Sequence, residues 1–204
     1  MKLSTEALLA QLAREDRGDD AVLAAARDVF LEFGIRRSRM GDIAERASMS
    51  PATLYRRYAG KEELATAVLA NAITSLLTDL DSTVSKDGPA DEQLSNAIVR
   101  VLLRVRDAPL LTRLLETDPE LVLPLITVRG ETLMMLGTNF ITGHLRRLMA
   151  DGLIAELDPA PVAEVLTRFV HSLFLTRASS LPLDDEKATR RMVRAIVRRL
   201  VPPT

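Results

Sequence analysis

The chain has 204 residues, of which 47% are hydrophobic and 27% are charged, and its formal net charge is −1. These values are typical of a globular protein of one or two domains with a substantial core. The sequence contains no cysteine, which excludes a disulfide framework and thiolate chemistry and fits a reducing compartment. No apolar run approaches the roughly 18 residues of a membrane span, and no signal-peptide pattern opens the chain, so we expect a cytoplasmic protein without membrane contact.

The composition favours helices over strands. Alanine and leucine are abundant, whereas aromatic residues make up only 3% of the chain. Because both abundant residues have high helix propensity, we expect an all-α protein.

The N-terminal part of the chain holds one uncertain segment and one predicted helix. Up to Gly18, three leucines lie at helical spacing, which fits either a short amphipathic helix or a frayed extension; they are Leu8, Leu9 and Leu12. Asp20 is then expected to cap a helix over 21–33, whose apolar residues form one stripe. Gly34 is expected to end this helix.

Two short helices joined by a tight turn are predicted over 38–61. Ser38 is the expected N-cap of the first helix, in which apolar residues recur at helical spacing. Ser50 is the expected cap of the second, and Pro51 suits its first turn because the missing N–H costs nothing there.

This region is strongly basic. Between Gly34 and Lys61 there are seven basic residues against two acidic ones, a net charge of about +5, which leaves about −6 for the rest of the chain. A short helix with basic outward side chains, braced by a second helix, suits reading of the DNA major groove. One basic region on a near-neutral chain suits contact with phosphates at one end only.

Several motifs in this region occur together at defined spacing. They are Ala26, Phe30 and Gly34, then Asp42-Ile43-Ala44, then Ser50-Pro51-Ala52-Thr53-Leu54-Tyr55-Arg56-Arg57-Tyr58, and then Lys61-Glu62-Glu63-Leu64. From about Asp20 to Leu69 the chain thereby resembles the N-terminal domain of TetR-family transcriptional regulators. One position departs from the family pattern, because Ser48 stands where the family usually has glycine in the turn. If this residue needs a positive φ, serine costs on the order of 1 kcal/mol there.

The chemistry of the region predicts a set of DNA contacts. Arginine can grip guanine through two hydrogen bonds and a threonine methyl group can contact thymine, which suits base reading. Free N–H groups at the helix starts, nearby serine hydroxyls and adjacent arginines suit phosphate binding, and the family resemblance adds Tyr55 and Lys61. The predicted base-reading residues are Pro51, Ala52, Thr53, Arg56 and Arg57, and the predicted phosphate-binding residues are Arg36, Arg37, Ser38, Arg39, Ser50, Tyr55 and Lys61.

The rest of the chain is predicted to be a series of helices separated by loops. The predicted segments are 61–84, 91–106, 109–115, 120–150, a helix that begins at Pro159, and a last helix capped by Asp184. The clearest loop is 86–89. Three glycines recur along 120–150, namely Gly130, Gly137 and Gly143. They fit close helix packing, space for a ligand, or glycines that a packed helix merely tolerates.

The middle helices carry a surplus of apolar side chains. This surplus fits a core or, as the family resemblance implies, a pocket for an effector of apolar character, in which a few polar groups orient the ligand. The candidate ligand-binding residues are Leu103, Met134, Thr138, Asn139, Phe140, His144 and Phe174.

The sequence offers little for catalysis or metal binding. The two histidines, His144 and His171, lie on different predicted helices, and no cysteine or further histidine stands at ligand spacing. We therefore expect no metal and no cofactor. Known nucleophile and phosphate-loop motifs are also absent from the sequence, so we expect no enzyme, with a helical hydrolase that uses His144 and a carboxylate as an alternative.

The last helix is basic and amphipathic. Its arginines are Arg190, Arg191, Arg194, Arg198 and Arg199. By the family resemblance, its apolar stripe and that of the preceding helix pair across a homodimer, while the arginines form a solvated or rim face. The candidate interface residues are Phe169, His171, Phe174, Met192, Ile196 and Leu200.

The sequence therefore predicts an N-terminal three-helix helix-turn-helix DNA-binding domain followed by a C-terminal helical ligand-binding and dimerisation domain. The expected division is an extension at 1–18, the DNA-binding domain at 19–66 and the regulatory domain at 67–204. The predicted function is a sequence-specific transcriptional regulator, a homodimeric repressor that a small-molecule effector releases from a palindromic operator. An alternative from another class is a helical protein–protein adaptor that has lost DNA binding.

Overall fold

The computed structural model describes residues 17–83, 87–176 and 181–202. Within these ranges the regular secondary structure is helical, apart from one isolated bridge residue at Ile154, so the predicted all-α class is confirmed. The predicted helix around Leu8, Leu9 and Leu12 lies outside the described residues. The described chain separates into two compact units.

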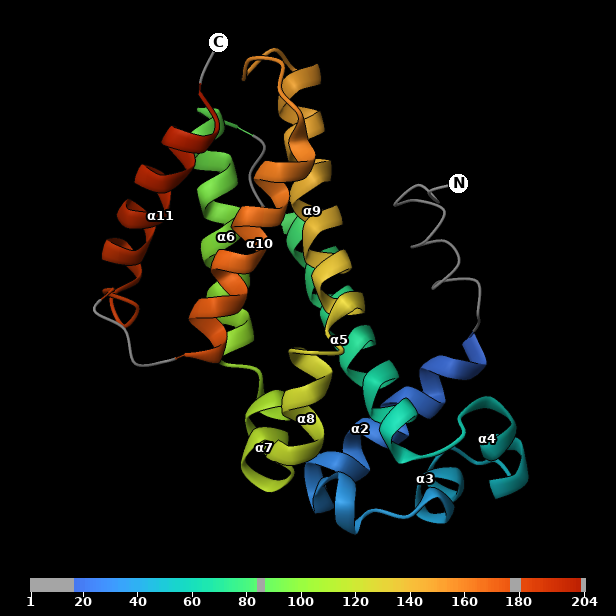
Figure 1. Ribbon diagram of the computed structural model, residues 1–204. Coiled ribbons are helices and arrows are strands. Elements are labelled where there is room, and N and C mark those ends of the chain that lie inside the picture. The colour runs from blue at the N-terminus through green and yellow to red at the C-terminus, as the bar shows by residue number, and fades with distance from the viewer. Residues whose placement is uncertain (1–16, 84–86, 177–180, 203–204) are drawn as a thin grey trace. The chain divides into compact units, whose positions relative to one another are not determined.

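The first unit contains residues 17–72 and 108–130. Its helices are α2 (Arg17–Arg37), α3 (Met40–Arg46), α4 (Pro51–Arg57), the first part of α5 (Lys61–Thr83), α7 (Pro109–Thr117) and α8 (Pro119–Ile126) (Figure 1). Helix α2 packs against both α3 and α7. The core of this unit includes the fully buried side chains of Val22, Ala26, Phe30, Ile43, Leu54 and Leu64.

The second unit contains residues 73–107 and 131–202. It holds the end of α5 together with α6 (Ala90–Arg106), α9 (Glu131–Ala150), α10 (Pro159–Leu175) and α11 (Glu186–Leu200). Helix α9 packs on α10, and α6 packs on α11. The buried core between these helices includes Leu94, Ile98, Leu145, Leu148, Leu166 and Val197. Residues 108–130 thus pack with the N-terminal helices, and the predicted functional division at residue 66 stays a prediction.

Several predicted helix limits need correction. Helix α2 includes Arg17–Gly18, so Asp20 lies within the helix and is not its cap. The cap of α11 is Asp185, whose Oδ1 accepts from the N–H groups of Lys187 and Ala188, rather than Asp184.

The predicted helix over 120–150 is two helices. The chain leaves helical geometry at Thr127, which has φ −122° and ψ −94°, and the N–H of Arg129 bonds to the carbonyl of Pro124 at 2.8 Å. A Cβ atom at Gly130 would lie 2.9 Å from the carbonyl oxygen of Thr127, so glycine permits this turn between α8 and α9.

Part of the arginine face of α11 is engaged rather than solvated. Arg194 Nε donates to Asp91 Oδ2 at 2.6 Å, and Arg198 Nε lies 3.6 Å from the same oxygen. Arg190 bonds to Asn96 and Glu186. The hydrogen bond from Arg194 lowers the pKa of Asp91 and raises the pKa of Arg194. The prediction of a solvated or rim face is therefore wrong for Arg190 and Arg194, which bind α6 or their own helix, whereas Arg198 is 69% exposed and fits it.

Candidate nucleic-acid interface

The turn between α3 and α4 has a conformation that favours glycine. Ser48 has a φ of 55°, and it is the non-glycine residue with positive φ in the described chain. The N–H groups of Ser48 and Met49 bond back to the carbonyls of Glu45 and Ala44 at 3.0 and 2.9 Å. This hydrogen bonding closes α3 and turns the chain, and a positive φ costs serine on the order of 1 kcal/mol.

Helix α4 is capped and anchored as the sequence predicts. Ser50 Oγ accepts from the N–H of Thr53 at 3.2 Å, and Pro51 is the first helical residue. Leu54 is fully buried and holds α4 against the unit. The cap and the anchor together fix which side of this short helix faces outward.

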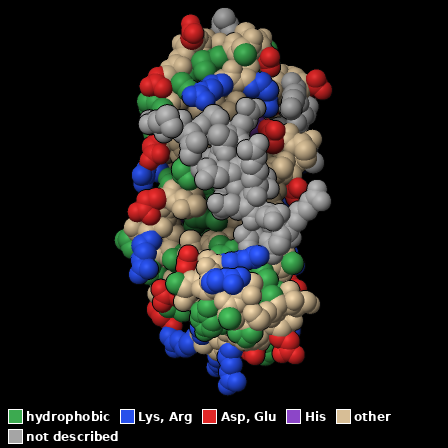
Figure 2. Space-filling model, turned by 90° about the vertical axis from the view of Figure 1, so that its right-hand side faces the viewer, with side chains coloured by type: hydrophobic (Ala, Val, Ile, Leu, Met, Phe, Trp, Pro, Cys, Tyr) green, Lys and Arg blue, Asp and Glu red, His purple; other side chains and the backbone are tan. Residues whose placement is uncertain are grey.

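The outward side of α4 carries most of the predicted DNA contacts. Tyr55 is 55% exposed, and Thr53 is half-buried with its hydroxyl oxygen 2.9 Å from Ser50 Oγ. The remaining predicted residues are exposed, namely Pro51, Ala52, Arg56 and Arg57. Figure 2 shows Lys and Arg side chains projecting from the surface of the first unit, in the lower part of the view.

The segment before α3 differs in part from the prediction. Helix α3 begins at Met40 after an N-cap at Arg39 that makes no side-chain cap bond, so Ser38 is not the cap. Ser38 is 3% exposed and its Oγ donates to the carbonyl oxygen of Ile35 at 2.7 Å. Its hydroxyl is therefore removed from the expected phosphate contacts, because it is buried against the preceding turn. Arg37 and Arg39 are exposed.

Lys61 joins the start of α5 to this same segment. Its Nζ donates to the carbonyl oxygens of Arg36 and Ser38 at 2.7 and 2.9 Å. An ammonium group has three donors, so one donor stays available for a phosphate. Lys61 therefore also positions the entry to α3.

The role of Asp118 was not predicted. Gly34 interrupts α2 with φ 77° and ψ 173°, which leaves the next two N–H groups without helical acceptors. Asp118 accepts both, from Ile35 at 2.9 Å and from Arg36 at 2.8 Å, and also accepts from Thr117 Oγ1 at 2.7 Å. The Asp118 side chain thus fixes the end of α2 just before the helix-turn-helix.

These hydrogen bonds also determine the pKa of the Asp118 carboxyl group. Burial alone would raise the pKa of Asp118, which is 1% exposed. The hydrogen bonds from Thr117 and from the N–H groups of Arg36 and Ile35 outweigh burial, so the pKa lies below its ordinary value. Asp118 is therefore a carboxylate at neutral pH.

The predicted ligand-binding residues fall into separate places in the second unit. Leu103 and Phe174 line one cavity of about 170 Å³, together with Leu102, Arg106, Leu173, Leu183 and Asp184. The candidates on α9 do not line it. His144 is 2% exposed, its Nδ1 lies 3.1 Å from the carbonyl oxygen of Phe140, and the two rings are 4.4 Å apart. Thr138 Oγ1 donates to the carbonyl oxygen of Met134 in its own helix at 2.8 Å, and Asn139 is half-buried.

The predicted interface residues on α10 and α11 are all half-buried in the single chain; they are Phe169, His171, Phe174, Met192, Ile196 and Leu200. Phe169, Met192 and Leu200 pack against the core with part of their surface left exposed. Val165 on α10 is 53% exposed and was not predicted. Apolar side chains therefore remain open on both helices.

The structure also bears on metal and membrane binding. Among the described residues, no group of three or more His, Asp or Glu side chains is placed to hold a metal ion. In the same ranges no single helix has the length and hydropathy of a membrane span. Helices α8 and α9 taken together have a sufficient length and composition, but the chain bends by 46° between them.

Comparison with known proteins identifies the family. Residues 22–68 match the model of bacterial regulatory proteins of the tetR family. An HTH-type transcriptional regulator of Mycobacterium tuberculosis (strain H37Rv) is 31% identical over 147 residues, which are 71% of this chain and 68% of that protein. The chain belongs to the TetR family.

Solved structures agree with this assignment at the level of the fold. The TetR-family repressor QsdR of R. erythropolis superimposes with a TM-score of 0.68 at 21% identity, covering 90% of this chain and 94% of that one. The regulator FadR of Bacillus subtilis, in complex with stearoyl-CoA, gives a TM-score of 0.52 at 19% identity over 89% and 97%. This TetR-family protein is a DNA-binding transcriptional regulator, and α3 and α4 form its helix-turn-helix.

Proposed function

We propose that this TetR-family regulator is a cytoplasmic, homodimeric repressor that leaves a palindromic operator when a small effector with apolar character binds. The observation that carries the proposal is the outward face of α4, where exposed Arg56 and Arg57 stand beside Pro51 and Ala52 while Leu54 anchors the helix. A braced, basic, solvent-facing helix suits insertion into the major groove.

Base reading and phosphate binding are assigned to different residues. Arg56 and Arg57 reach base edges, because a guanidinium can donate two parallel hydrogen bonds to guanine. Lys61, Tyr55, Arg37 and Arg39 contact phosphates, which position the protein without reading sequence.

A dimer follows from the half-buried apolar side chains on α10 and α11. Phe174 and Ile196 keep apolar surface that a second copy would cover, and a two-fold axis makes such an interface self-complementary. Two recognition helices related by this axis fit two half-sites about one helical turn, roughly 34–36 Å, apart.

The effector is assigned to the cavity lined by Leu103 and Phe174. Its walls are mainly apolar, and Arg106 and Asp184 are the charged residues that line it. The complex of FadR with stearoyl-CoA is an example of a ligand with an apolar chain in a protein of similar fold. Helix α5 contains residues of both compact units, so an effector that shifts α5 would change the DNA affinity.

The proposal includes no catalysis. His144, the imidazole that the hydrolase alternative requires, is 2% exposed and lies against the carbonyl of Phe140. Asp81 Oδ1 lies 3.8 Å from His144 Nε2, but the ring offers almost no exposed surface to a substrate, which favours regulation over hydrolysis.

The test uses DNA selected from random fragments and fluorescence anisotropy. Arg56→Ala should weaken binding to the selected sequence by about 1–3 kcal/mol with little effect on random DNA. Lys61→Ala should weaken binding to both and reduce the slope of log K against log salt by about one. Arg104→Ala, which removes an exposed arginine of α6, is the matched control and should change neither. If Arg56→Ala and Arg57→Ala both keep the sequence preference, the base-reading assignment is wrong.

The effector part is tested separately. A compound found by thermal-shift screening is titrated into the protein with and without operator DNA. Linkage requires that DNA weakens the compound by the same factor as the compound weakens DNA, typically about 5–150-fold. Equal affinities in the two titrations would remove the effector mechanism and leave DNA binding intact.

A further inference from the structure

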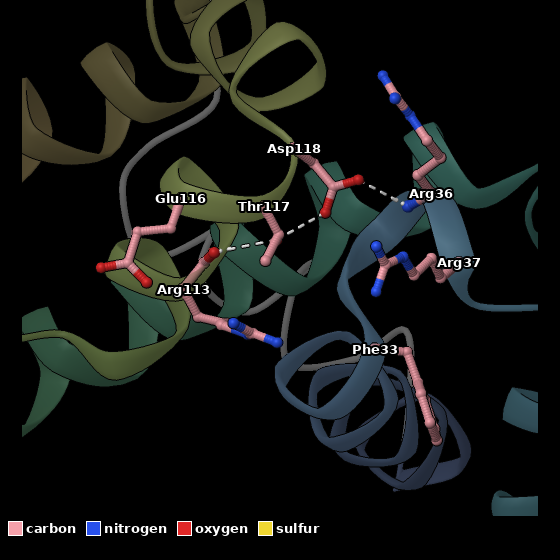
Figure 3. A pocket seen from close by; sticks show the side chains of 7 residues that line it. All are labelled: Phe33, Arg36, Arg37, Arg113, Glu116, Thr117 and Asp118. Carbon is pink, nitrogen blue, oxygen red and sulfur yellow. Dashed lines mark hydrogen bonds between the residues drawn. The ribbon is translucent and has the colours of Figure 1, made fainter.

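A second cavity lies in the first unit, apart from the cavity assigned to the effector. Its volume is about 380 Å³, within the range of small-molecule sites. The last turn of α2 and the C-terminal half of α7 form its walls (Figure 3). Nothing in the DNA-binding role of the unit requires a cavity here.

Two guanidinium groups face this cavity from opposite walls. In Figure 3 the side chains of Arg37, from α2, and Arg113, from α7, point toward one another. Arg113 Nε donates to the carbonyl oxygen of Leu31 at 3.3 Å, which orients the group and leaves its terminal nitrogens for a ligand. Neither arginine has an ion-pair partner among the described residues. Two cations therefore converge on one space.

The acidic residues nearby do not neutralise this pair. Asp118 already accepts from two backbone N–H groups and from Thr117. Glu116 points away from the two guanidinium groups in Figure 3, and Glu120 pairs with Arg36. The net environment favours a single negative charge between Arg37 and Arg113, since guanidinium groups bind carboxylates with two parallel hydrogen bonds.

The lining also includes one aromatic side chain. Phe33 lines the cavity and is 43% exposed, so its ring is available to a second apolar group. Aromatic rings pair favourably in offset or edge-to-face arrangements. A cationic pair beside an exposed ring is suited to a flat organic anion.

We propose that this cavity binds a small aromatic carboxylate, with the carboxylate between Arg37 and Arg113 and the ring against Phe33. The bound anion neutralises Arg37, which the proposed function assigns to a DNA phosphate, and the anion therefore lowers the affinity for DNA. This loss of DNA affinity rests on the proposed function, whereas binding of the anion does not.

The experiment measures benzoate binding to the full chain by isothermal titration calorimetry, with benzamide as the uncharged isostere and inorganic phosphate as the non-aromatic anion. Wild type should bind benzoate at least about tenfold more tightly than either comparison compound. Arg113→Gln should weaken benzoate about tenfold or more, and Phe33→Ser should weaken it several-fold. Arg104→Gln, the control at an exposed arginine of α6, should bind as wild type does. Circular dichroism establishes that each variant is folded.

Three results would overturn the proposal. They are the absence of benzoate binding to wild type, equal binding of benzoate and benzamide, and unchanged benzoate affinity in folded Arg113→Gln and Phe33→Ser. A loss of DNA affinity in Arg113→Gln without any benzoate binding would assign the two arginines to DNA instead. Benzoate binding in a protein that binds no DNA would leave this site standing while the proposed function fell.

Discussion

The buried carboxylate of Asp118 should contribute a large share of the stability of the DNA-binding unit. Asp118→Ala leaves the N–H groups of Ile35 and Arg36 without the acceptors now at 2.9 and 2.8 Å. A buried donor without a partner costs about 1–3 kcal/mol, so for the two donors together we expect a loss of about 2–6 kcal/mol. Domains of this size have a total stability of roughly 5–15 kcal/mol. The change should therefore be visible as a much lower unfolding midpoint.

The assay is urea unfolding followed by far-ultraviolet circular dichroism, with the free energy obtained by linear extrapolation. Asp118→Asn, which keeps one acceptor, should lose less than Asp118→Ala. Asp28→Ala removes an exposed aspartate of α2 whose partner Arg27 is equally exposed, and should stay within about 0.5 kcal/mol of wild type. A loss below about 1 kcal/mol in Asp118→Ala would refute the assigned role of the carboxylate.

The same carboxylate predicts a pH dependence. The pKa of Asp118 in the folded protein is lowered, so the unfolded state binds the proton first as pH falls. The stabilisation is present above the unfolded pKa, about 3.9, and is lost as pH falls through the folded pKa. The free energy of unfolding should thus fall less steeply below about pH 4 in Asp118→Ala than in wild type, and identical slopes would contradict this.

Three further predictions concern backbone conformation and assembly. Gly34→Ala should lower the free energy of unfolding by more than about 2 kcal/mol, because φ is +77° and a Cβ would lie 2.4 Å from Asp118 Oδ2. Gly88→Ala, with φ +92° but no atom within 4 Å of the Cβ, should lower it by about 1–2 kcal/mol. Equal losses in the two variants would show that the steric contact at Gly34 adds nothing. Ser48→Gly should stabilise by up to about 1 kcal/mol, since φ is 55°, and raise Tm by roughly 2–4 °C; an unchanged or lower Tm counts against strain at this turn. Ile196→Glu should yield monomers or unfolded protein in sedimentation experiments, because an unpaired charge is costly in an apolar interface; a wild-type monomer at micromolar concentration would show that the interface is misassigned.

The features that were predicted correctly are local in sequence. Ser50 and Pro51 define the start of α4 by contacts within three residues, and the same holds for Asp158 and Pro159 at α10. The family pattern marked Ser48 as a position where a positive φ was possible, and its φ is 55°. Such features depend on capping and backbone sterics, which neighbouring residues determine.

The features that were missed depend on residues far apart in sequence. Ser38 has the chemistry of a cap, but tertiary packing turns its hydroxyl toward Ile35 and leaves the cap position to Arg39. Asp118 lies 83 residues from Ile35, whose N–H it accepts, and no periodicity indicates that pairing. Its sequence setting, an aspartate before a proline, predicts a helix cap, and the side chain instead serves another helix.

The predicted ligand-binding residues do not share one cavity, for the same reason. Leu103 and Phe174 share a cavity because α6 and α10 bring them together, whereas the α9 candidates face other surroundings. An apolar surplus in sequence does not distinguish a core residue from a cavity wall, since both are apolar and only packing separates them.

The measurement that tests the central claim most directly is the ratio of affinities for selected and scrambled DNA of equal length, at one physiological salt concentration. A sequence-reading regulator should bind the selected sequence at least about 10³-fold more tightly. The selected sequence should contain two inverted half-sites with centres about 10–10.5 base pairs, or a multiple, apart. Equal affinity for the two DNAs, or the absence of inverted half-sites, would contradict the account.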